Sequence, residues 1–266
     1  MGRNDRAIKK IDPSFLLTAI ADDKSLVGMD PYVLIPSLKI IQGLSDAPLK
    51  KQFGEGAVII RPGDKRVWVE NENPYLFVAL LFFVEYAKWS DINDASQQMI
   101  LERNFNPDSE IARRSRESKL RKEKYGPDGK FEYRYIEHLR FPGIIYSEGE
   151  LNKFPVTLSF EKGEFMKGRN FISACTLRRE VVDGTPRQVP LWAQVWFMSA
   201  SLRNRGSYSW YGHDFEPAGL IDPADAEYLK GEHLKLVEAH AVGRVQVEDE
   251  MTGIDQTVDV SKEAGF

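Results

Sequence analysis

The sequence of 266 residues contains one cysteine, four histidines and no long apolar run. Cys175 alone cannot form an internal disulfide, and a zinc finger built on several cysteines is excluded for the same reason. A reducing interior is therefore the natural compartment. No stretch approaches the roughly 18 apolar residues that cross a bilayer. The charged start MGRNDRAIKK is not followed by the apolar core of a signal peptide, so we do not expect secretion.

The signatures of common catalytic sites are also missing. The chain contains no HExxH, GxGxxG or GxxxxGK[ST] motif. Its histidines, His138, His213, His233 and His240, show no HxH spacing and no close cluster of acids. Cys175 lies in the apolar stretch FISACTL and is expected to be a small buried side chain. We therefore expect no enzymatic activity, no metal and no cofactor.

The most informative stretch is strongly basic. Between Arg113 and Arg140, ten Arg or Lys residues face five acids, a local charge of 10 − 5 = +5 in a chain whose total is −4. Aromatic residues are interspersed at Tyr125, Phe131 and Tyr133 and at Tyr135. Cations neutralise phosphates and flat rings stack on bases, which is the combination that binds single-stranded nucleic acid. A solvated charged helix that leads into an ordinary hairpin explains the same pattern.

Local signals predict the structure of this basic arm, residues 106–140. Asn106-Pro107-Asp108 starts a helix that should continue to residue 124, although its apolar stripe is thin. Gly126-Pro127-Asp128-Gly129 predicts a tight turn, and the alternation that follows predicts a strand. The rings of that strand belong either to the core or to a surface, and our hypothesis is that part of the arm stays mobile or exposed until DNA orders it.

Two further stretches, residues 162–179 and 203–211, combine cations with aromatic rings. An ordinary loop with buried rings and solvated arginines is the alternative for each. We take the three stretches together as one DNA-binding surface, with cations on phosphates and the Tyr and Trp rings on bases. The predicted DNA-binding residues are Arg113, Arg114, Arg116, Lys119, Arg121, Lys122, Lys124, Tyr125, Lys130, Tyr133, Arg134, Tyr135, Lys167, Arg169, Arg178, Arg203, Arg205, Tyr208, Trp210 and Tyr211.

Turn signals and apolar patterns divide the chain into short elements. We expect helices over residues 12–28, 91–105, 109–124 and 222–239, and a loop over 43–56. The apolar run 75–89 fits a strand or a helix by period, and its Phe, Val and Tyr content favours a buried central strand. Other strands are expected over residues 31–42, 57–61, 66–70, 141–146, 154–160, 171–179, 188–202, 242–247 and 254–260.

These elements predict a single α+β domain that is rich in antiparallel sheet, with peripheral helices and the basic arm. We divide the chain into a mobile basic leader (1–11), an α+β DNA-binding domain (12–249) and an acidic C-terminal tail (250–266). The strand expected over 188–202 has two apolar faces, with Trp192 and Trp196 on one of them, so we expect a homo-oligomer.

The C-terminal part has the opposite charge. From Asp214 to Phe266, thirteen acids face four Lys or Arg residues, a net charge of 4 − 13 = −9. Such a segment can compete with DNA for the basic surface or bind a basic partner such as a polymerase. An ordinary acidic terminus is the alternative.

Several motifs carry a resemblance to a known family. These are PSLKIIQ (36–42), FGEG (53–56), RPGD (61–64), the apolar run 76–84 and EYAKW (85–89). Over residues 31–90 they resemble the N-terminal half of phage-encoded single-stranded DNA-binding proteins. The length and the basic-then-acidic order resemble the Drc-type RNA polymerase cofactors of N-four-related podophages. The motifs include no catalytic residue, so the resemblance assigns no site residue.

The resemblance implies a fold that is not a standard OB barrel. It also implies sequence-tolerant binding of single-stranded DNA in the host cytoplasm, where the protein would assist transcription by a phage RNA polymerase. The alternative function is that of a virion structural or assembly protein with no role in DNA binding.

Overall fold

The structure, a computed structural model, describes residues 33–92, 100–125, 131–147, 150–151, 155–243 and 245–247. Residues 1–32 lie outside these ranges, and so do the leader and the helix expected over 12–28. The strand expected over 254–260 and the acidic tail lie outside them as well.

Strands dominate the described residues. They are β1 (Val33–Ile35), β2 (Ser37–Ile40), β3 (Val58–Arg61), β4 (Lys65–Trp68), β5 (Tyr75–Ala79), β6 (Phe83–Ile92), β7 (Ile100–Asn104), β8 (Lys122–Tyr125), β9 (Phe131–Ser147), β10 (Glu150–Leu151), β11 (Val156–Glu161), β12 (Arg179–Val182), β13 (Thr185–Gln188), β14 (Gln194–Arg205), β15 (Tyr208–Leu220) and β16 (Val245–Val247). The helices are α2 (Ala47–Phe53), α3 (Glu110–Arg116), α4 (Phe165–Leu177) and α5 (Ala226–Ala241), with short 3-10 turns η2 (Lys162–Glu164), η3 (Leu191–Ala193) and η4 (Pro223–Asp225).

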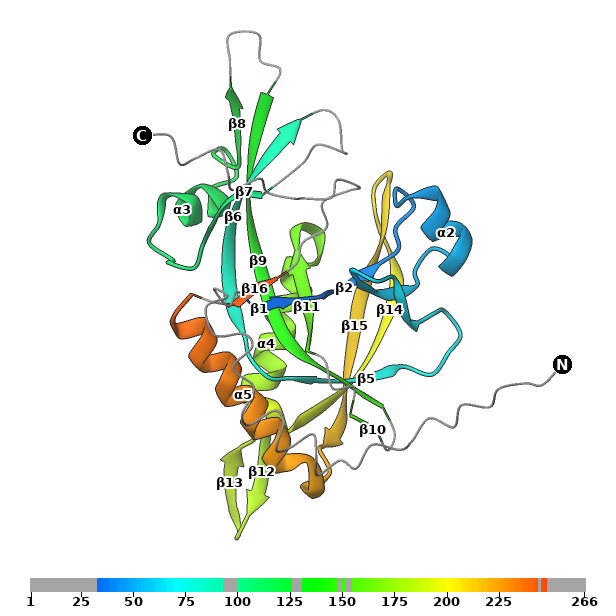
Figure 1. Cartoon of the computed structure of the whole chain (residues 1–266), viewed down its shortest axis with the longest axis vertical. Coiled ribbons are helices and arrows are strands. Elements are labelled where there is room, and N and C mark those ends of the chain that lie inside the picture. Colours follow the sequence, from blue (N-terminus) through cyan, green and yellow to red (C-terminus); the bar gives the residue numbers. More distant parts are fainter. Residues whose placement is uncertain are drawn as a thin grey trace, which may run out of the picture. The chain divides into compact units, whose positions relative to one another are not determined.

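The main sheet is organised around the long strand β9 (Figure 1). Its path runs β15-β14-β5-β9-β11-β2-β3-β4, and β6, β8 and β10 also pair with β9. These pairings are antiparallel except for β11 with β2, where Thr157 lies opposite Ser37. Within the described residues the path has two open ends, β15 and β4. The expected α+β fold, rich in antiparallel sheet and different from a standard OB barrel, is therefore confirmed.

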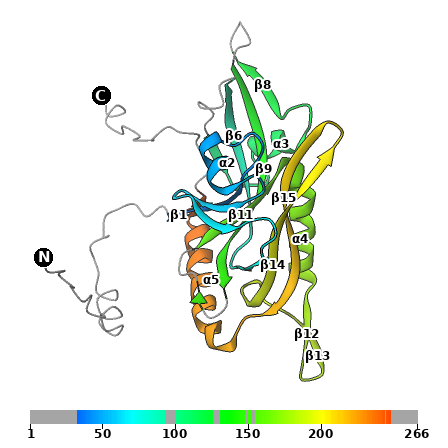
Figure 2. The ribbon, with the colours of Figure 1, turned by 90° about the vertical axis from the view of Figure 1, so that its right-hand side faces the viewer.

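The core has two main parts, each built around one helix. On one side Phe171 and Cys175 of α4 pack against rings that include Phe141, Phe160 and Trp196. On the other side, helix α5 packs against a cluster that includes strands β5 and β9. Figure 2 shows α4 and α5 on opposite sides of these strands. Burying apolar faces on both sides of a sheet is the usual way in which an α+β layer structure is stabilised.

Gly168 sets how closely α4 approaches the sheet. A Cβ atom at this buried position would lie 2.6 Å from Cβ of Phe160 and 2.8 Å from Cδ1 of Leu139. Glycine therefore lets the helix backbone pack directly on β9 and β11. This close packing fixes the position of the first turn of α4, which borders the site described below.

Several expected elements are confirmed. The hairpin of β3 and β4 closes at residues 61–64, between the strands expected over 57–61 and 66–70. The C-terminal helix begins where Asp222 caps η4, because its carboxylate accepts a hydrogen bond from the Ala224 N–H. The apolar run over 75–89 is buried strand as favoured, but it forms two strands, β5 and β6. The chain turns between them, and the Leu80 and Leu81 N–H groups both donate to the Pro142 carbonyl.

Other expectations were wrong. The helix expected over 109–124 ends at Arg116, because Ile111 and Ala112 supply its buried apolar side chains and residues 122–125 instead pair with β9. Residues 43–56 contain α2, and the described end of the 91–105 segment is strand β7. Residues 171–179 lie mostly in α4, since Gly168, Phe171 and Cys175 recur at helical spacing and are all buried.

The strand expected over 188–202 is shorter than predicted. A 3-10 turn at Leu191–Ala193 precedes β14. A bulge between Val195 and Trp196 then breaks the alternation, so both side chains are buried. On the other face, Phe197 is 41% exposed. Trp196 packs in the core of the single chain, and the oligomer inferred from this strand stays a prediction.

Candidate nucleic-acid interface

An open groove of about 530 Å³ lies where the basic arm meets the second basic stretch. Its lining comes from three parts of the chain that are distant in sequence. The groove residues are Ser115, Arg121, Lys122, Arg134, Tyr135, Ile136, Glu137, Lys162, Phe165 and Met166. Two of the three predicted clusters therefore contribute to one surface.

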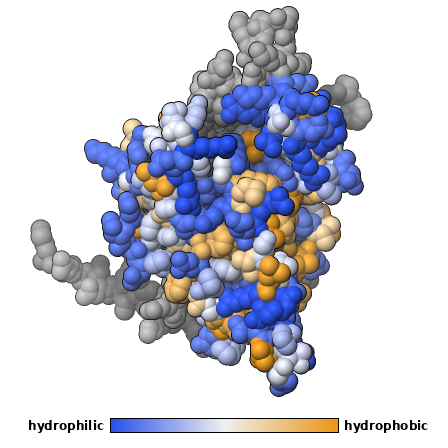
Figure 3. Space-filling model, turned by 180° about the vertical axis from the view of Figure 1, so that it is seen from behind, coloured by the Kyte–Doolittle hydropathy of each residue, from blue (hydrophilic) through white to orange (hydrophobic). Residues whose placement is uncertain are grey.

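Strand β9 contributes four consecutive residues to the groove, from Arg134 to Glu137. One side is formed by the end of α3 and the segment leading into β8, and the other by η2 and the first turn of α4. Figure 2 shows α3 and α4 on the same side of β9. Figure 3 views this side of the molecule, where hydrophilic side chains surround a central region with exposed apolar ones.

Hydrogen bonds attach the α3 side of the groove to the sheet. The Arg121 Nε donates to the Ser115 carbonyl at 2.7 Å. The Tyr135 N–H donates to the Arg121 carbonyl at 2.9 Å. The arm therefore folds back onto β9 after α3 ends, which brings Arg121 and Lys122 to the groove.

Four cations line the groove, namely Arg121, Lys122, Arg134 and Lys162. Arg121, Lys122 and Lys162 are exposed, and Lys162 Nζ lies 3.5 Å from Glu161 Oε1. Arg169, about one helical turn after the start of α4, is exposed, and its charge acts on Glu137 in the groove. Cations from separate elements meet here, as a phosphate-binding surface requires.

Glu137 is the sole acid among the groove residues. Burial raises the pKa of its carboxyl group, while the charges of Arg116, Arg121 and Arg169 oppose that rise. The three arginines therefore favour the ionised form. A partly buried carboxylate among cations is an unusual component of a phosphate-binding surface.

The apolar side chains of the groove come from α4. Phe165 is partly buried and Met166 is 62% exposed. Tyr135, predicted to stack on bases, is 5% exposed, and its hydroxyl donates to Glu123 Oε2 at 2.7 Å. Burial and Glu123 raise the pKa of Tyr135 to about 12. Its ring is therefore buried inside the protein. In this position the ring is not exposed for the base stacking predicted for it.

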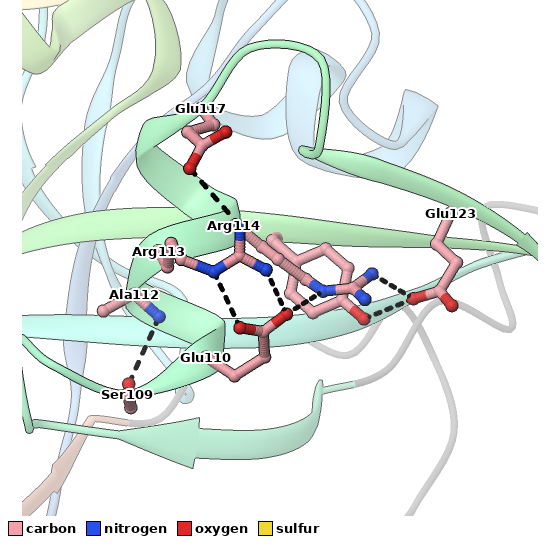
Figure 4. A network of polar contacts seen from close by, with 8 residues as sticks. Ser109, Glu110, Ala112, Arg113, Arg114, Glu117 and Glu123 are labelled. Carbon is pink, nitrogen blue, oxygen red and sulfur yellow. Dashed lines mark hydrogen bonds and ion pairs between the residues drawn. The ribbon is translucent and has the colours of Figure 1, made fainter.

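Arginines of α3 are paired with carboxylates (Figure 4). Arg113 binds Glu110 through two nitrogens, at 2.6 and 2.8 Å, and also contacts Glu117. Arg114 lies 2.8 Å from Glu110 and 2.6 Å from Glu123. Hydrogen bonds from Arg113 and then Arg114 lower the pKa of Glu110 to about 2. These partners would compete with phosphates for both arginines, so the position of Arg113 and Arg114 supports a role in holding α3.

The second and third clusters are joined through Asp214 of β15. Its Oδ1 accepts hydrogen bonds from Lys167 at 2.8 Å and from Arg203 at 2.7 Å. Desolvation acts to raise the pKa of Asp214, but hydrogen bonds from Arg203, Lys167 and Ser201 outweigh it and lower the pKa to about 2. Lys167 and Arg203 are therefore neutralised within the fold, although both were predicted to bind phosphates.

Aromatic residues of the third cluster also hold the hairpin of β14 and β15 to its neighbours. Trp210 donates to Glu164 Oε1 at 2.8 Å. The backbone of Tyr211 exchanges two hydrogen bonds with the Gln42 side chain. In contrast, Tyr208 is 76% exposed at the tip of the hairpin, opposite the exposed Arg205. Of this cluster, Tyr208 and Arg205 have the exposure that the predicted contacts with DNA require.

The remaining predicted residues are scattered. Arg116 donates to the Pro107 carbonyl and to the Tyr86 hydroxyl, and Lys119 is exposed. Tyr133 lies under Lys88, whose Nζ is 4.1 Å from the ring centroid. Arg178 lies over the Trp196 ring and is 3.9 Å from Glu180. The side chains of Lys124, Tyr125 and Lys130 lie outside the described residues.

Six groove residues were absent from the predicted set, namely Ser115, Ile136, Glu137, Lys162, Phe165 and Met166. The sequence signal for two of them existed, since Lys162 and Phe165 stand in the second basic stretch. Because residues 171–179 were expected to form a strand, the sequence did not indicate that the second basic stretch begins with η2 and continues into a helix. Met166 had no signal, because an exposed methionine has no distinctive pattern.

Metal binding has no support in the part of the chain that the structure describes. No group of three or more His, Cys, Asp or Glu side chains that could hold a metal ion occurs there. Among the described helices, none combines the length and the apolar character that crossing a membrane requires.

No curated protein and no solved structure matches the chain. A family model described as "Pam3 phage gp34-like protein" matches residues 27–242, which is well over half of the sequence. The chain therefore belongs to the Pam3 phage gp34-like protein family and is a phage protein.

Proposed function

We propose that this phage protein binds single-stranded DNA with little sequence dependence and that the groove is the centre of its binding surface. The observation that carries the proposal is the convergence of Arg121, Lys122, Arg134 and Lys162 beside the partly exposed Phe165. Cations for phosphates next to a ring for a base are the two components that single-strand binders combine. The net charge of the whole chain is −4, so binding would rest on this local surface.

The size of the groove agrees with a nucleotide ligand. Its volume of about 530 Å³ falls within the range of roughly 300–1,000 Å³ that small-molecule sites occupy. A single strand presents unpaired bases that can enter such a groove, whereas a duplex keeps its bases stacked inside. Single strands are therefore favoured over duplex DNA in this proposal.

The test compares groove variants with a matched control. Lys122→Ala and Lys162→Ala each remove one groove cation, and Lys235→Ala removes one cation from α5 that is 75% exposed. Binding of a fluorescent single-stranded oligonucleotide is measured by anisotropy at several salt concentrations. Each groove variant should bind more weakly and lower the salt slope by about 0.7 per lost phosphate contact, while the control keeps the wild-type slope.

Two results would contradict the proposal. If the groove variants and Lys235→Ala change binding equally, the groove is not the binding surface. If the wild-type protein co-purifies with phage particles and binds no oligonucleotide, the role of a virion structural or assembly protein takes its place.

The proposal extends to transcription through the resemblance to Drc-type cofactors and through the charge asymmetry of the chain. The protein would hold melted DNA and recruit a phage RNA polymerase, with the acidic C-terminal residues facing the polymerase. A variant ending at residue 249 should keep its affinity for single-stranded DNA and lose association with the polymerase in a pull-down. Unchanged association would move the polymerase contact elsewhere on the chain.

A further inference from the structure

We propose that Glu137 makes the groove discriminate among bases, favouring cytosine over thymine in a bound single strand. The inference rests on the proposed function, since it adds a preference for one base at a single position of the same groove, while the phosphate contacts stay independent of sequence. It starts from the one groove residue whose charge opposes phosphate binding. A carboxylate at such a position lowers the affinity for the phosphate backbone, but it can accept hydrogen bonds from a base.

The position of Glu137 makes it available to a ligand. The residue lies on β9 opposite Tyr86 of β6, and its side chain lines the groove. It is partly buried, and within the described ranges its carboxylate forms no hydrogen bond and no ion pair. Nearby acids differ in this respect. Glu110 and Glu123 are each bound by arginines of α3.

Surrounding positive charges favour the ionised form of this carboxylate and oppose the rise in pKa that burial causes, and they do so without occupying its oxygens. Arg116, Arg121 and Arg169 act on Glu137 through their charge. An ionised carboxylate accepts hydrogen bonds and donates none. The groove therefore presents an acceptor between cations that would hold the phosphates on either side of a base.

The chemistry of the two pyrimidines makes the prediction specific. Cytosine carries an amino group at the ring position where thymine carries a carbonyl oxygen. The carboxylate can accept a hydrogen bond from the cytosine amino group, whereas it repels the thymine oxygen. Because both bases are pyrimidines of similar size, Phe165 stacks on either, and the difference in affinity reports the polar contact.

The experiment measures the affinities of the full-length protein for oligo(dC) and oligo(dT) of equal length at neutral pH and fixed salt. We expect the wild-type protein to bind oligo(dC) about tenfold more tightly, as one hydrogen bond to a charged group allows. In Glu137→Gln, the amide both donates and accepts, so the ratio should fall towards one. The affinity for oligo(dT) should rise in this variant, because the negative charge that repels the thymine oxygen has been removed from the groove.

Glu117→Gln is the matched control. It removes the same charge from the end of α3, where Glu117 is paired with Arg113 and does not line the groove. This variant should keep the wild-type ratio. A thermal melt of each variant confirms that it is folded.

The outcomes separate the two proposals. Equal wild-type affinities for oligo(dC) and oligo(dT), together with a normal salt slope, would overturn the role of Glu137 and leave single-strand binding intact. A preference that persists in Glu137→Gln would also overturn it. Absence of binding to either oligonucleotide would remove the proposed function and this inference together.

Discussion

The carboxylate of Asp214 joins strand β15 to helix α4, because its Oδ1 lies 2.8 Å from Nζ of Lys167. The same oxygen accepts from Arg203 of β14 at 2.7 Å. Two cations that the sequence marks as phosphate ligands are thus tied together by one acid. The cations of the basic stretches therefore fall into two groups. Some form ion pairs that stabilise the fold, and others line the groove.

Replacing Asp214 by Asn should lower stability and change its pH dependence. The variant loses two charge-assisted hydrogen bonds, and because the site is about one-third exposed we expect a cost of about 1 kcal/mol near neutral pH. The pKa of Asp214 is lowered from 3.8 to about 2 in the folded protein, so its contribution is present above pH 4 and is lost as the pH falls through 2. Urea unfolding should show the difference between wild type and variant shrinking over that range. A difference that is constant down to pH 2 would contradict this assignment.

His213 should make the fold less stable in mild acid. Burial lowers the pKa of this histidine from 6.5 to about 4, although Asp214 acts in the opposite direction. Between these values the unfolded chain binds a proton that the folded chain does not, so stability should fall as the pH falls from 6.5 to 4. His213→Phe removes this titration and retains an edge contact with Phe160. As the pH falls through this window, the free energy of unfolding of the variant should rise relative to that of wild type by up to about 1.4 kcal/mol per pH unit. Parallel stability curves for the two proteins would show that His213 is not responsible.

The close approach of α4 to the sheet can be tested with two glycines. Gly168→Ala should destabilise the protein by about 1–3 kcal/mol, because the added Cβ meets Phe160 and Leu139. Gly231→Ala in α5 is the control, since its Cβ would meet no atom within 4 Å. There the same substitution should stabilise the protein by about 0.5–1 kcal/mol through helix propensity. Thermal melts that move in the same direction for both variants would refute the packing argument.

Much of the fold could be predicted from local signals. Turn residues located the β3–β4 hairpin, and the Asp222-Pro223 cap located the C-terminal helix. The wrong predictions concern segments in which tertiary packing decides between the helical period and the strand period. Phe171 and Cys175 satisfy helical spacing in a segment whose composition favours a strand, and contact with Phe141 and Trp196 resolves the choice.

The site could be predicted only in part. The sequence shows that Arg121 and Lys122 are basic, but it cannot show that they meet Lys162 across β9. It also cannot show which arginines are paired across elements, because Glu123 and Asp214 find their arginine partners only in the folded chain. Charge counting therefore detected the basic stretches, but it could not separate the cations that carboxylates pair in the fold from those that line the groove.

The most direct test of the account is a salt titration of binding to single-stranded and double-stranded oligonucleotides of equal length. With four groove cations on phosphates, the logarithm of the affinity for a single strand should fall with the logarithm of the salt concentration at a slope of roughly −3. The single strand should bind more tightly than the duplex throughout. Equal affinities for the two, a flat salt dependence or no binding at all would contradict the account.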